Sequence, residues 1–571
     1  MKLFGALLFA GYAMAQVQGF KVVTQQMLEN PSPDDWLMFS RTYDAQRFSP
    51  LKEINQGNVS KLKVAWERQM AAGQTETVPI VHDGVMYIVN PGAVVQALDG
   101  ATGKVLWEYK HPAPANQAAQ GRTKSLAIYQ DIVVYTAPDS FVVGLDARTG
   151  EPRWRTKADT RGNTSGPIIA DGKVISGGAC SGNRNNCFIS AHDALTGKEL
   201  WRFYTTPAAG EPGDESWNGA PVDRRQASTW GLPGSYDPKT KTTFWGIANP
   251  MPDQRSQRHE GNPDGTSRTA PADLYSNSTV AIDLNTGKLK WYYQHLPGDD
   301  WDSDYTHERT LLRTRINPDP KNVKWISSSI PRGQERDVAV TVGEAGGIWV
   351  LDRTDGKFLW ANPFPFDAKE FVVSNVDVKT GLSSMNADLI FRNPGDQHVV
   401  CYWNTRSYWP TAYSPSTNSL YVPYIDNCRD LTIAGGPGGG RGGWKVVPRP
   451  GSDPNALTGI AKIDLSTGET LRFNVGRVPI NGAMLATAGD LVFNGDMSGM
   501  FRAFDAKSGK TLWETNTGGN VSVSTITYAV KGKQYVCIMT GDNLKVPELA
   551  GEFPEIKTPK GHNFIYVYAL P

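Results

Sequence analysis

The chain has 571 residues and a formal net charge of +1 at pH 7, with 58 basic and 57 acidic side chains. This balance gives no electrostatic basis for a nucleic-acid or polyanion partner. The 17 Trp, 58 Gly and 38 Pro indicate many short strands and turns, and the length suffices for a sizeable core. We therefore expect an all-β protein.

Residues 1–15 have the features of a secretory signal. Lys2 is followed by an apolar run, Leu3 to Tyr12, and by the small-residue sequence Ala13-Met14-Ala15, which is the order found in cleavable signals. The run is too short to cross a bilayer, and no later stretch approaches the ~20 apolar residues of a membrane helix. We predict an exported chain whose mature part, residues 16–571, is a single domain without a membrane span. A retained N-terminal anchor is the alternative.

The five cysteines are few for this length. In an oxidising compartment their short separations favour two disulfides, Cys180 with Cys187 and Cys401 with Cys428. Cys537 lies within an apolar strand and is predicted to be a buried free thiol. No Cys-x-x-Cys-His sequence occurs, which argues against a covalently attached c-type haem.

A sequence repeat runs through the chain: an apolar residue, Asp, two variable residues, Thr or Ser, Gly, Lys or Glu, two variable residues and Trp. In each copy we expect a strand to end at the Asp, the Gly to supply a positive φ in the turn, and the next strand to carry the Trp. The seven copies, some of which vary one position, are Leu98–Trp107, Leu145–Trp154, His192–Trp201, Ile282–Trp291, Leu351–Trp360, Ile463–Arg472 and Phe504–Trp513.

The first copies recur about every 47 residues, which is the length of a four-stranded propeller blade. We predict an eight-bladed β-propeller in which an N-terminal strand, Leu62–Trp66, and a C-terminal strand, Asn563–Ala569, close the ring, because paired termini leave no free sheet edge. Glycine-rich residues 435–443 lack the Lys-Ser/Thr pair of a P-loop and are predicted to be a surface loop. Insertions on one face are expected at residues 205–226, 251–272, 363–398 and 434–452.

Four carboxylates lie within six residues directly after a predicted strand, and they are Asp299, Asp300, Asp302 and Asp304. Carboxylates this close raise one another's pKa, which favours a bound hard metal ion, a carboxylate kept basic for proton abstraction, or both. The alternative is a solvated acidic turn, because Asp is also a favoured turn residue.

The repeat, the signal and the Trp-Asp-x-Asp sequence at 301–304 together resemble the alcohol dehydrogenases that depend on pyrroloquinoline quinone (PQQ). Members of that family are eight-bladed propellers with tryptophan-docking repeats, and the resemblance covers nearly the whole mature chain. It implies a periplasmic quinoprotein that oxidises an alcohol to the carbonyl compound with PQQ and Ca²⁺ or a lanthanide ion. A soluble cytochrome c or another external acceptor would then take the electrons.

The resemblance also implies roles for individual residues. It assigns the catalytic base to Asp302, and metal ligation to Asn249, Asp302 and Asp304; Asp304 is similar to the added carboxylate of lanthanide-dependent members. Asp299 and Asp300 are expected either to support the site or to be solvated turn residues.

For PQQ, the resemblance implies contacts from Glu76, Arg122, Thr164 and Trp230. Trp230 would lie flat beneath the quinone, since an aromatic floor fixes the plane of a tricyclic ring. The alternatives are a core position for Trp230 and a surface ion pair for Arg122.

Three positions depart from the family pattern. The adjacent cysteine pair is absent from residues 117–122, the metal-ligand Glu is replaced by Cys180, and the Arg or Lys that contacts the quinone carbonyls is missing near Ala345. We interpret Asp304 as compensating for the lost Glu charge.

The same departures resemble members that act on bulky or secondary alcohols, such as the mycotoxin deoxynivalenol, and we predict a substrate of that kind. The competing interpretation is a non-enzymatic propeller that acts as a binding or assembly scaffold. Propeller sugar dehydrogenases are a further rival, but they lack this docking repeat.

Overall fold

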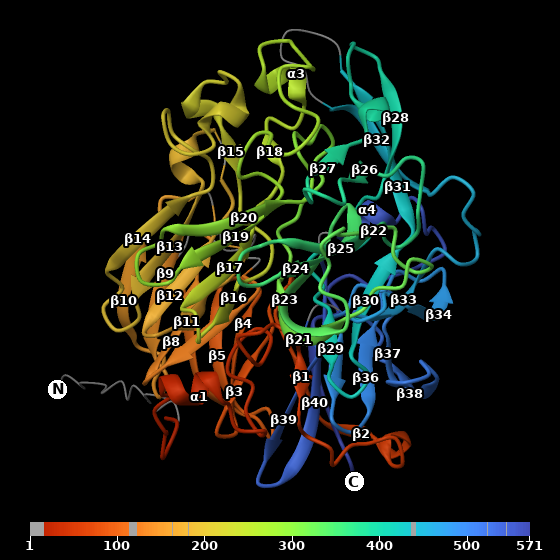
Figure 1. The fold of residues 1–571 in the computed structure, drawn as a ribbon. Helices are drawn as coiled ribbons and strands as arrows, with labels where there is room; N and C mark the ends of the chain where they lie inside the picture. The colour runs from red at the N-terminus through yellow and green to blue at the C-terminus, as the bar shows by residue number, and fades with distance from the viewer. Residues whose placement is uncertain are drawn as a thin grey trace, which may run out of the picture.

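The computed structural model describes residues 16–112, 123–160, 162, 164–180, 182–434, 441–521, 524–543 and 545–571. The predicted signal at residues 1–15, Arg122, and residues 435–440 of the glycine-rich loop lie outside these residues. Strands dominate the rest of the chain (Figure 1), which confirms the all-β prediction.

Eight sheets in the described part of the chain contain four or five strands, and all their pairings are antiparallel except that of β1 with β35. The sheets are the candidates for the eight predicted blades. The first four comprise β3 (Ile80–His82), β4 (Val85–Asn90), β5 (Val94–Asp99) and β6 (Val105–Lys110); β7 (Leu126–Tyr129), β8 (Ile132–Thr136), β9 (Phe141–Asp146) and β10 (Pro152–Lys157); β11 (Ile168–Ala170), β12 (Lys173–Gly177), β13 (Phe188–Asp193) and β14 (Glu199–Tyr204); and β16 (Ser235–Asp237), β17 (Thr242–Gly246), β19 (Ser278–Asp283) and β20 (Leu289–Gln294). The other four comprise β21 (Thr310–Ile316), β23 (Gln334–Gly343), β24 (Gly346–Asp352), β25 (Phe358–Asn362) and β22 (Trp325–Ile326); β29 (Ala412–Ser414), β30 (Ser419–Ile425), β33 (Thr458–Asp464) and β34 (Thr470–Gly476); β1 (Phe48–Ser49), β35 (Leu485–Thr487), β36 (Leu491–Gly495), β37 (Met500–Asp505) and β38 (Thr511–Asn516); and β2 (Lys63–Gln69), β41 (Phe564–Ala569), β40 (Lys533–Thr540) and β39 (Ile526–Val530).

The two ends of the chain share one sheet. Strand β2 pairs antiparallel with β41, and the register places Lys63 opposite Ala569 and Gln69 opposite Phe564. Figure 1 shows the blue C-terminal strands β39 and β40 beside the red N-terminal segment. The predicted pairing of the terminal strands is confirmed.

The Asp of the repeat caps its own turn. Asp99 Oδ1 accepts hydrogen bonds from the backbone N–H groups of Ala101 (3.0 Å) and Thr102 (2.9 Å) and from the Thr102 hydroxyl (2.8 Å). Side-chain bonds of this kind fix a tight turn at the end of a strand. Asp193, Asp283, Asp464 and Asp505 make the same set of bonds.

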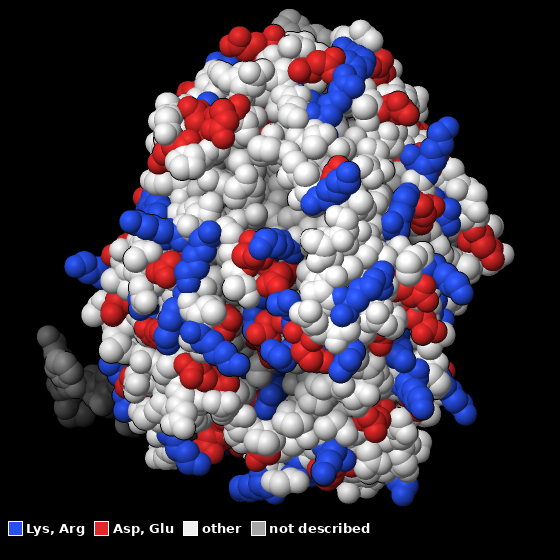
Figure 2. Space-filling view, in the orientation of Figure 1, with Lys and Arg blue, Asp and Glu red and all other residues white. Residues whose placement is uncertain are grey.

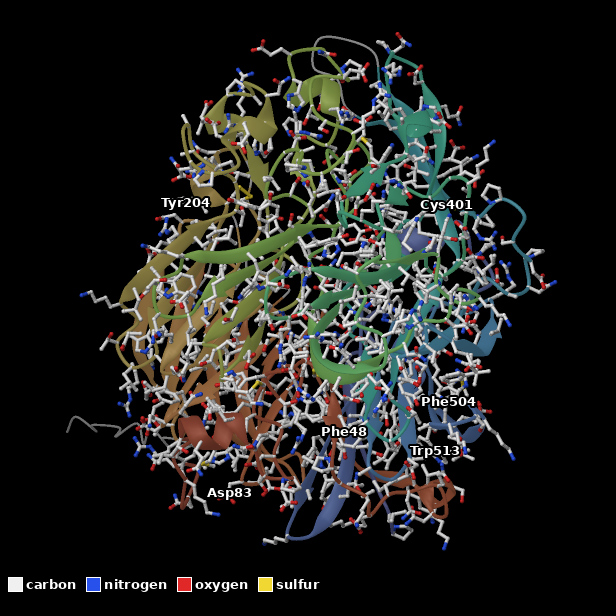
Figure 3. The ribbon with its side chains drawn as sticks, viewed as in Figure 1. Phe48, Asp83, Tyr204, Cys401, Phe504 and Trp513 are labelled. Atoms are coloured by element: carbon white, nitrogen blue, oxygen red, sulfur yellow. A yellow bond between two sulfur atoms is a disulfide. The ribbon has the colours of Figure 1, made fainter. Side chains whose placement is uncertain are left out.

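The Trp of one copy docks on the turn of the next sheet. Trp107 Nε1 donates to the carbonyl of Ala147 over 2.9 Å, and Trp66, Trp154 and Trp201 bond in the same way to later turns. The turn residue Gly150 has a φ of +78°, and a Cβ atom there would lie 2.5 Å from the Trp107 ring. The repeat therefore needs Gly for its conformation and for the space that the indole occupies. Figure 3 labels Phe504 and Trp513 of the last copy, which lie on the paired strands β37 and β38.

Insertions gather in the upper half of Figure 1. They form short sheets and helices whose elements are β15 (Gln226–Ala227), β18 (Pro250–Met251), α3 (Arg255–Arg258), β26 (Val373–Val376), β27 (Ser383–Met385), β28 (Gln397–Cys401), β31 (Asn427–Ile433) and β32 (Arg441–Pro448). The remaining elements are α1 (Gln25–Glu29), α4 (Lys545–Leu549) and the 3-10 helices Val59–Lys61, Arg184–Asn186, Asp214–Trp217, Val222–Arg224 and Ala387–Leu389.

Both predicted disulfides are present, Cys180–Cys187 and Cys401–Cys428, and Cys537 is a buried free thiol. Within the described residues no helix has the length and apolar character required to span a bilayer. Basic and acidic side chains are interspersed on the face shown in Figure 2, in keeping with the balanced net charge.

Candidate active site

The acidic stretch forms a buried turn between β20 and β21, and Asp299 and Asp300 hold it in place. Asp299 accepts bonds of 2.6 and 2.7 Å from two backbone N–H groups of the turn itself. Asp300 accepts bonds from the backbone N–H groups of Arg255 (2.7 Å) and Phe391 (2.8 Å), which tie the turn to two insertions. Burial raises the pKa of Asp300 to about 7. Both carboxylates are buried, so the solvated-turn interpretation is wrong for them, and they support the turn.

Asp302 differs from its neighbours because its carboxylate is accessible. The side chain is 28% exposed, and Arg429 Nη1 lies 3.7 Å from its Oδ2. The backbone has a φ of 63°, a conformation that is uncommon outside glycine, costs about 1–3 kcal/mol and clusters at functional positions. The turn therefore presents one carboxylate beside a buried guanidinium.

Asp304 connects two other predicted site residues. Its Oδ1 accepts the backbone N–H of Asn249 over 2.9 Å, and its Oδ2 accepts the Trp230 indole N–H over 2.7 Å. Burial raises the pKa of Asp304 well above its usual value, and the charges of Glu344 and Asp302 raise it further. Such a group is stable as an anion only beside a cation.

Lys124 is a site residue that the sequence analysis missed. Its ammonium lies 3.1 Å from Glu76 Oε2, and both side chains are only 2% exposed. The same ammonium lies over the Trp230 ring, 5.3 Å from its centroid, and over the Tyr408 ring, at 5.4 Å. A cation over an aromatic face is attracted by the ring quadrupole. Among the described residues of this segment, Lys124 is the cation that contacts Trp230. It follows Arg122 by two positions in the sequence.

Thr164, for which the resemblance implies a PQQ contact, lies next to Trp230. Its hydroxyl donates to the Trp230 carbonyl over 3.0 Å, and the Lys124 ammonium bonds the same carbonyl at 3.4 Å. The structure therefore brings Glu76, Thr164 and Trp230 together around Lys124.

The segment near Ala345, where the family has a cation, presents an acid. Glu344 is 4% exposed, its backbone N–H donates to the Asp304 carbonyl over 2.9 Å, and its Oε2 has no hydrogen-bond partner among the described residues. Burial raises the pKa of Glu344 to about 7, Lys545 opposes that rise, and Asp302 adds to it. Lys545 Nζ lies 3.8 Å from Glu344 Oε1.

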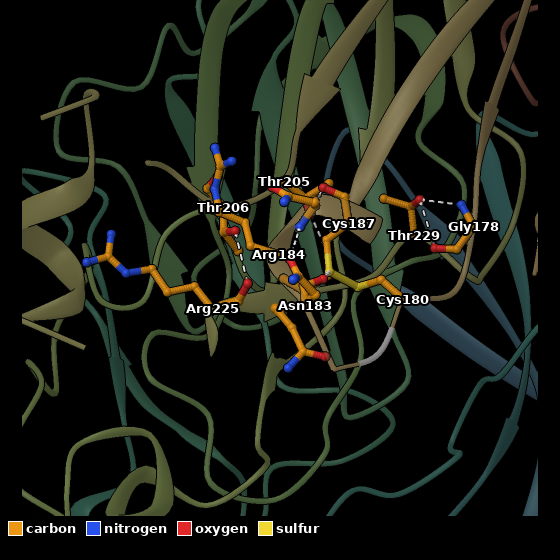
Figure 4. Close-up of a disulfide and its surroundings, with 12 residues drawn as sticks. Gly178, Cys180, Asn183, Arg184, Cys187, Thr205, Thr206, Arg225 and Thr229 are labelled. Carbon is orange, nitrogen blue, oxygen red and sulfur yellow. Dashed lines mark hydrogen bonds between the residues drawn. A yellow bond between two sulfur atoms is a disulfide. The ribbon is translucent and has the colours of Figure 1, made fainter. Parts of the chain in front are cut away.

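The Cys180–Cys187 disulfide occupies the loop from which a metal-ligand Glu was expected (Figure 4). In the same loop, the backbone of Gly178 bonds the hydroxyl of Thr229 over 2.8 Å, and Thr229 directly precedes Trp230. The disulfide loop therefore supports the Trp230 segment, and its sulfur atoms are bonded to each other, which removes them as metal ligands.

An aromatic pair lies near Asp302 on the insertion made by β28, β31 and β32. The centroids of Trp403 and Trp444 are 5.0 Å apart, and the Arg429 guanidinium lies 5.3 Å from the first ring and 5.9 Å from the second. Trp444 is 40% exposed, whereas Trp403 is buried. This pair was not predicted, because Trp403 follows β28, Trp444 lies in β32, and the two rings meet only in the folded insertion.

The donor atoms at the site suit a hard cation and a planar anionic cofactor. Buried oxygen atoms of Glu76 and Glu344 have no partner in the described part of the chain, which is costly unless a ligand completes them. No three His, Cys, Asp or Glu side chains of the described residues are grouped so that they could hold a metal ion. The ligand set implied by the resemblance is not a group of that kind, because it contains two carboxylates and the amide of Asn249. These are hard oxygen donors of the kind that calcium and lanthanide ions prefer.

A family comparison matches residues 36–365 and 457–536 to the β-propeller domain of PQQ-dependent glucose, ethanol and alcohol dehydrogenases. The quinohemoprotein alcohol dehydrogenase ADH-IIG of Pseudomonas putida is 29% identical over 587 residues, covering 95% of this chain and 76% of that protein. The quinoprotein alcohol dehydrogenase PedE of Pseudomonas putida is 30% identical, covering 96% of this chain and 92% of that protein.

Solved structures share the fold. The quinohemoprotein alcohol dehydrogenase of Comamonas testosteroni has a TM-score of 0.78 at 25% identity, covering 96% of this chain and 82% of that one. A europium-containing methanol dehydrogenase has a TM-score of 0.79 at 24% identity, covering 96% of this chain and all of that one.

Proposed function

The chain belongs to the family of PQQ-dependent alcohol dehydrogenases and is an enzyme of that kind; on this basis we propose that Asp302 is its catalytic base, within a site formed by Trp230, Asn249 and Asp304. The observation that carries the proposal is the pair of hydrogen bonds that joins Asp304 to Trp230 and to Asn249. An aromatic floor and the backbone of Asn249 are therefore joined through the carboxylate of Asp304, which lies two residues from Asp302, the one carboxylate of the turn that is accessible. Membership of an enzyme family leaves the scaffold interpretation without support.

The proposed cofactor contacts are Trp230, Glu76, Thr164 and Lys124. The Trp230 indole offers a flat surface for a tricyclic ring, and the Lys124 ammonium offers a positive charge for a cofactor carboxylate. Glu76 Oε1 is buried without a partner and is free to accept a hydrogen bond from a ring N–H. Lys124 takes the role that the sequence analysis assigned to Arg122.

The proposed metal ligands are Asn249, Asp302 and Asp304, for Ca²⁺ or a lanthanide ion. Each Asp304 oxygen already accepts one hydrogen bond and keeps a second lone pair. Glu344 adds a third carboxylate nearby, and this one is buried. This concentration of negative charge supports a cation of high charge at the site.

When bound, PQQ supplies the carbon that accepts hydride, and the metal ion supplies positive charge that polarises the adjoining carbonyl. Asp302 accepts the hydroxyl proton of the alcohol as hydride leaves the carbinol carbon, so the carbonyl product forms without a net charge. Trp230 excludes water from one face of the site, and Asp304 fixes the rotation of the indole through its N–H.

For the substrate we propose a bulky or secondary alcohol that carries an apolar ring, with deoxynivalenol as one compound to test. Trp403 and Trp444 support this choice, since a partly exposed indole backed by a second one provides a surface on which a ring can pack. For electron transfer we propose a soluble cytochrome c or another external acceptor, in the periplasm. Export predicts a mature chain that begins at Gln16, which mass spectrometry of secreted protein would detect.

The decisive experiment reconstitutes the purified chain with PQQ and either Ca²⁺ or a lanthanide, and measures cofactor absorbance and dye reduction with a panel of primary and secondary alcohols. Asp302→Asn should bind PQQ normally and lose roughly 10²–10⁴-fold in kcat, the usual contribution of a general base. Asp355→Asn, at an exposed turn, is the matched control and should keep full activity. Normal turnover by Asp302→Asn, or no PQQ uptake with either ion, would refute the proposal.

A further inference from the structure

The proposed base, Asp302, lies close to the acids Asp304 and Glu344, and the segment near Ala345 carries an acid where the resemblance implies a cation that contacts the quinone carbonyls. Glu344 lies beside Ala345, where the family resemblance implies Arg or Lys, and the nearby Lys545 is engaged by Glu344 at 3.8 Å and Glu548 at 3.0 Å. A carboxylate in a strained turn, 28% exposed and close to other acids, has several orientations available to it. A contact that restricts these orientations would favour the proton transfer proposed for Asp302.

Arg429 has the geometry to do so. Its side chain is buried, Nη2 donates to the carbonyl of Trp301, and Nη1 lies 3.7 Å from Asp302 Oδ2. One planar guanidinium therefore contacts the peptide that precedes Asp302 and also faces its carboxylate. A rigid fork of this kind restricts both the backbone and the side chain of its partner.

Arg429 is itself held on three sides. It lies in β31, the middle strand of the sheet formed with β28 and β32, and it directly follows Cys428, which the disulfide joins to β28. The rings of Trp403 and Trp444 flank its guanidinium at 5.3 and 5.9 Å. Supporting contacts of this kind fix a functional side chain within the narrow tolerance that catalysis needs.

We propose that Arg429, supplied by the insertion strand β31, is the positioning residue for Asp302. The inference rests on the proposed function, because it assigns Arg429 a task only if Asp302 is the base. In this role Arg429 acts on the reaction through Asp302.

The test compares Arg429→Met, Arg429→Lys and the control Arg449→Met in enzyme loaded with PQQ and Ca²⁺. Arg449 also lies on this insertion and forms a two-bond pair with the buried Asp426, so its loss reproduces the removal of an arginine from a carboxylate. Arg429→Met should lower kcat at least 30-fold with KM and PQQ absorbance within threefold of wild type, and Arg429→Lys should recover part of the loss. Arg449→Met should keep kcat within threefold.

Two further measurements separate positioning from a merely structural role. Substrate deuterated at the carbinol carbon should show a larger isotope effect on kcat in Arg429→Met, because the chemical step becomes slower. In an Asp302→Asn background, Arg429→Met should change the residual rate less than twofold, since the group that it positions is gone. If Arg429→Met does not fold, Arg429→Lys takes its place, with a loss of at least fivefold in kcat at unchanged KM expected.

An unchanged kcat in the folded Arg429 variant would overturn the proposal, and so would a loss matched by Arg449→Met or fully additive with Asp302→Asn. Failure of the proposed function would be recognised by a different result: Asp302→Asn itself would retain turnover, whatever the Arg429 variants do.

Discussion

Trp230 and Asp304 are joined by a hydrogen bond from the indole Nε1 to the carboxylate Oδ2 over 2.7 Å. The flat surface proposed for PQQ and an oxygen donor proposed for the metal ion are therefore parts of one unit. The second Asp304 oxygen accepts the Asn249 backbone N–H. A substitution of Trp230 should therefore also change the affinity for the metal ion.

Trp230→Phe should weaken PQQ binding roughly tenfold, because it removes the N–H donor, worth about 1 kcal/mol, and part of the stacking surface. The dissociation constant measured by tryptophan fluorescence and cofactor absorbance checks this. Trp245→Phe is the control, since Trp245 is buried in β17 and donates to Thr243 Oγ1 over 2.8 Å. An equal effect on PQQ binding in both variants would contradict the assignment of Trp230.

Asp304→Ala should weaken metal binding by at least tenfold, because it removes a carboxylate proposed as a direct ligand. Terbium luminescence sensitised by nearby tryptophan measures binding without any dependence on turnover. The loss should be larger for Tb³⁺ than for Ca²⁺, since a trivalent ion gains more from each negative charge. Unchanged metal affinity and turnover in Asp304→Ala would show that Asp304 is not a ligand and does not compensate for the charge of the missing Glu.

Lys124→Met should both destabilise the fold and weaken PQQ binding, since Lys124 pairs with the buried Glu76 at 3.1 Å. Breaking one side of a buried ion pair costs about 3–5 kcal/mol, because the remaining charge loses its partner. The double variant Glu76→Gln with Lys124→Met should regain most of the stability, measured by urea denaturation, but not the PQQ affinity. Recovery of both would mean that Lys124 serves only to neutralise Glu76.

The parts of the fold that the sequence predicted are those set by local chemistry. Asp, Gly and Trp recur at fixed spacing because each turn needs a side-chain cap, a positive φ and room for an indole, and these needs are visible in any one copy. The Cys180–Cys187 disulfide and the pairing of the terminal strands were also predictable, the first from its short separation and the second from the need to close a sheet edge.

The site was predicted less completely, because part of it depends on distant packing. Asp302, Asp304, Asn249 and Trp230 lie in short motifs that the family resemblance marks. Lys124 was missed because two cations in one segment look equivalent until their packing is known. Glu344 and Arg429 were missed because their contacts with Asp304 and Asp302 come from packing between segments that are far apart in the sequence.

Gly150→Ala should destabilise the protein by about 2–4 kcal/mol. An alanine there pays about 1–2 kcal/mol for the left-handed conformation and more for displacing the Trp107 ring, which lies 2.5 Å from the new Cβ position. Gly92 has a similar φ of +84° but has no atom within 4 Å of that position, so Gly92→Ala should cost only the conformational part. Chemical denaturation of both variants isolates the cost of crowding the indole, and equal losses would argue against the docking role of the repeat.

Glu552 should make the stability of the wild-type protein fall as pH rises. Burial raises the pKa of Glu552 to about 8, the nearby charge of Asp426 adds to the rise, and Asn427 and Arg477 oppose it. In the unfolded chain a Glu pKa is about 4.3, so between these values the folded state binds more protons than the unfolded state. The protonated group contributes fully to the free energy of unfolding below about pH 4.3. This contribution is lost progressively until about pH 8, by roughly 1.4 kcal/mol per pH unit at most.

Glu552→Gln removes this titration, so the variant should gain stability over wild type from pH 5 to pH 8, by up to about 4 kcal/mol. Urea denaturation at pH 5, 6.5 and 8 measures the difference. Glu555→Gln is the matched control: Glu555 also bonds Arg477, at 2.6 Å, and its pKa is lowered by that bond, so it stays ionised throughout and its curve should run parallel to wild type. Parallel curves for Glu552→Gln and wild type would mean that Glu552 is ionised in the folded protein and that Arg477 compensates its charge.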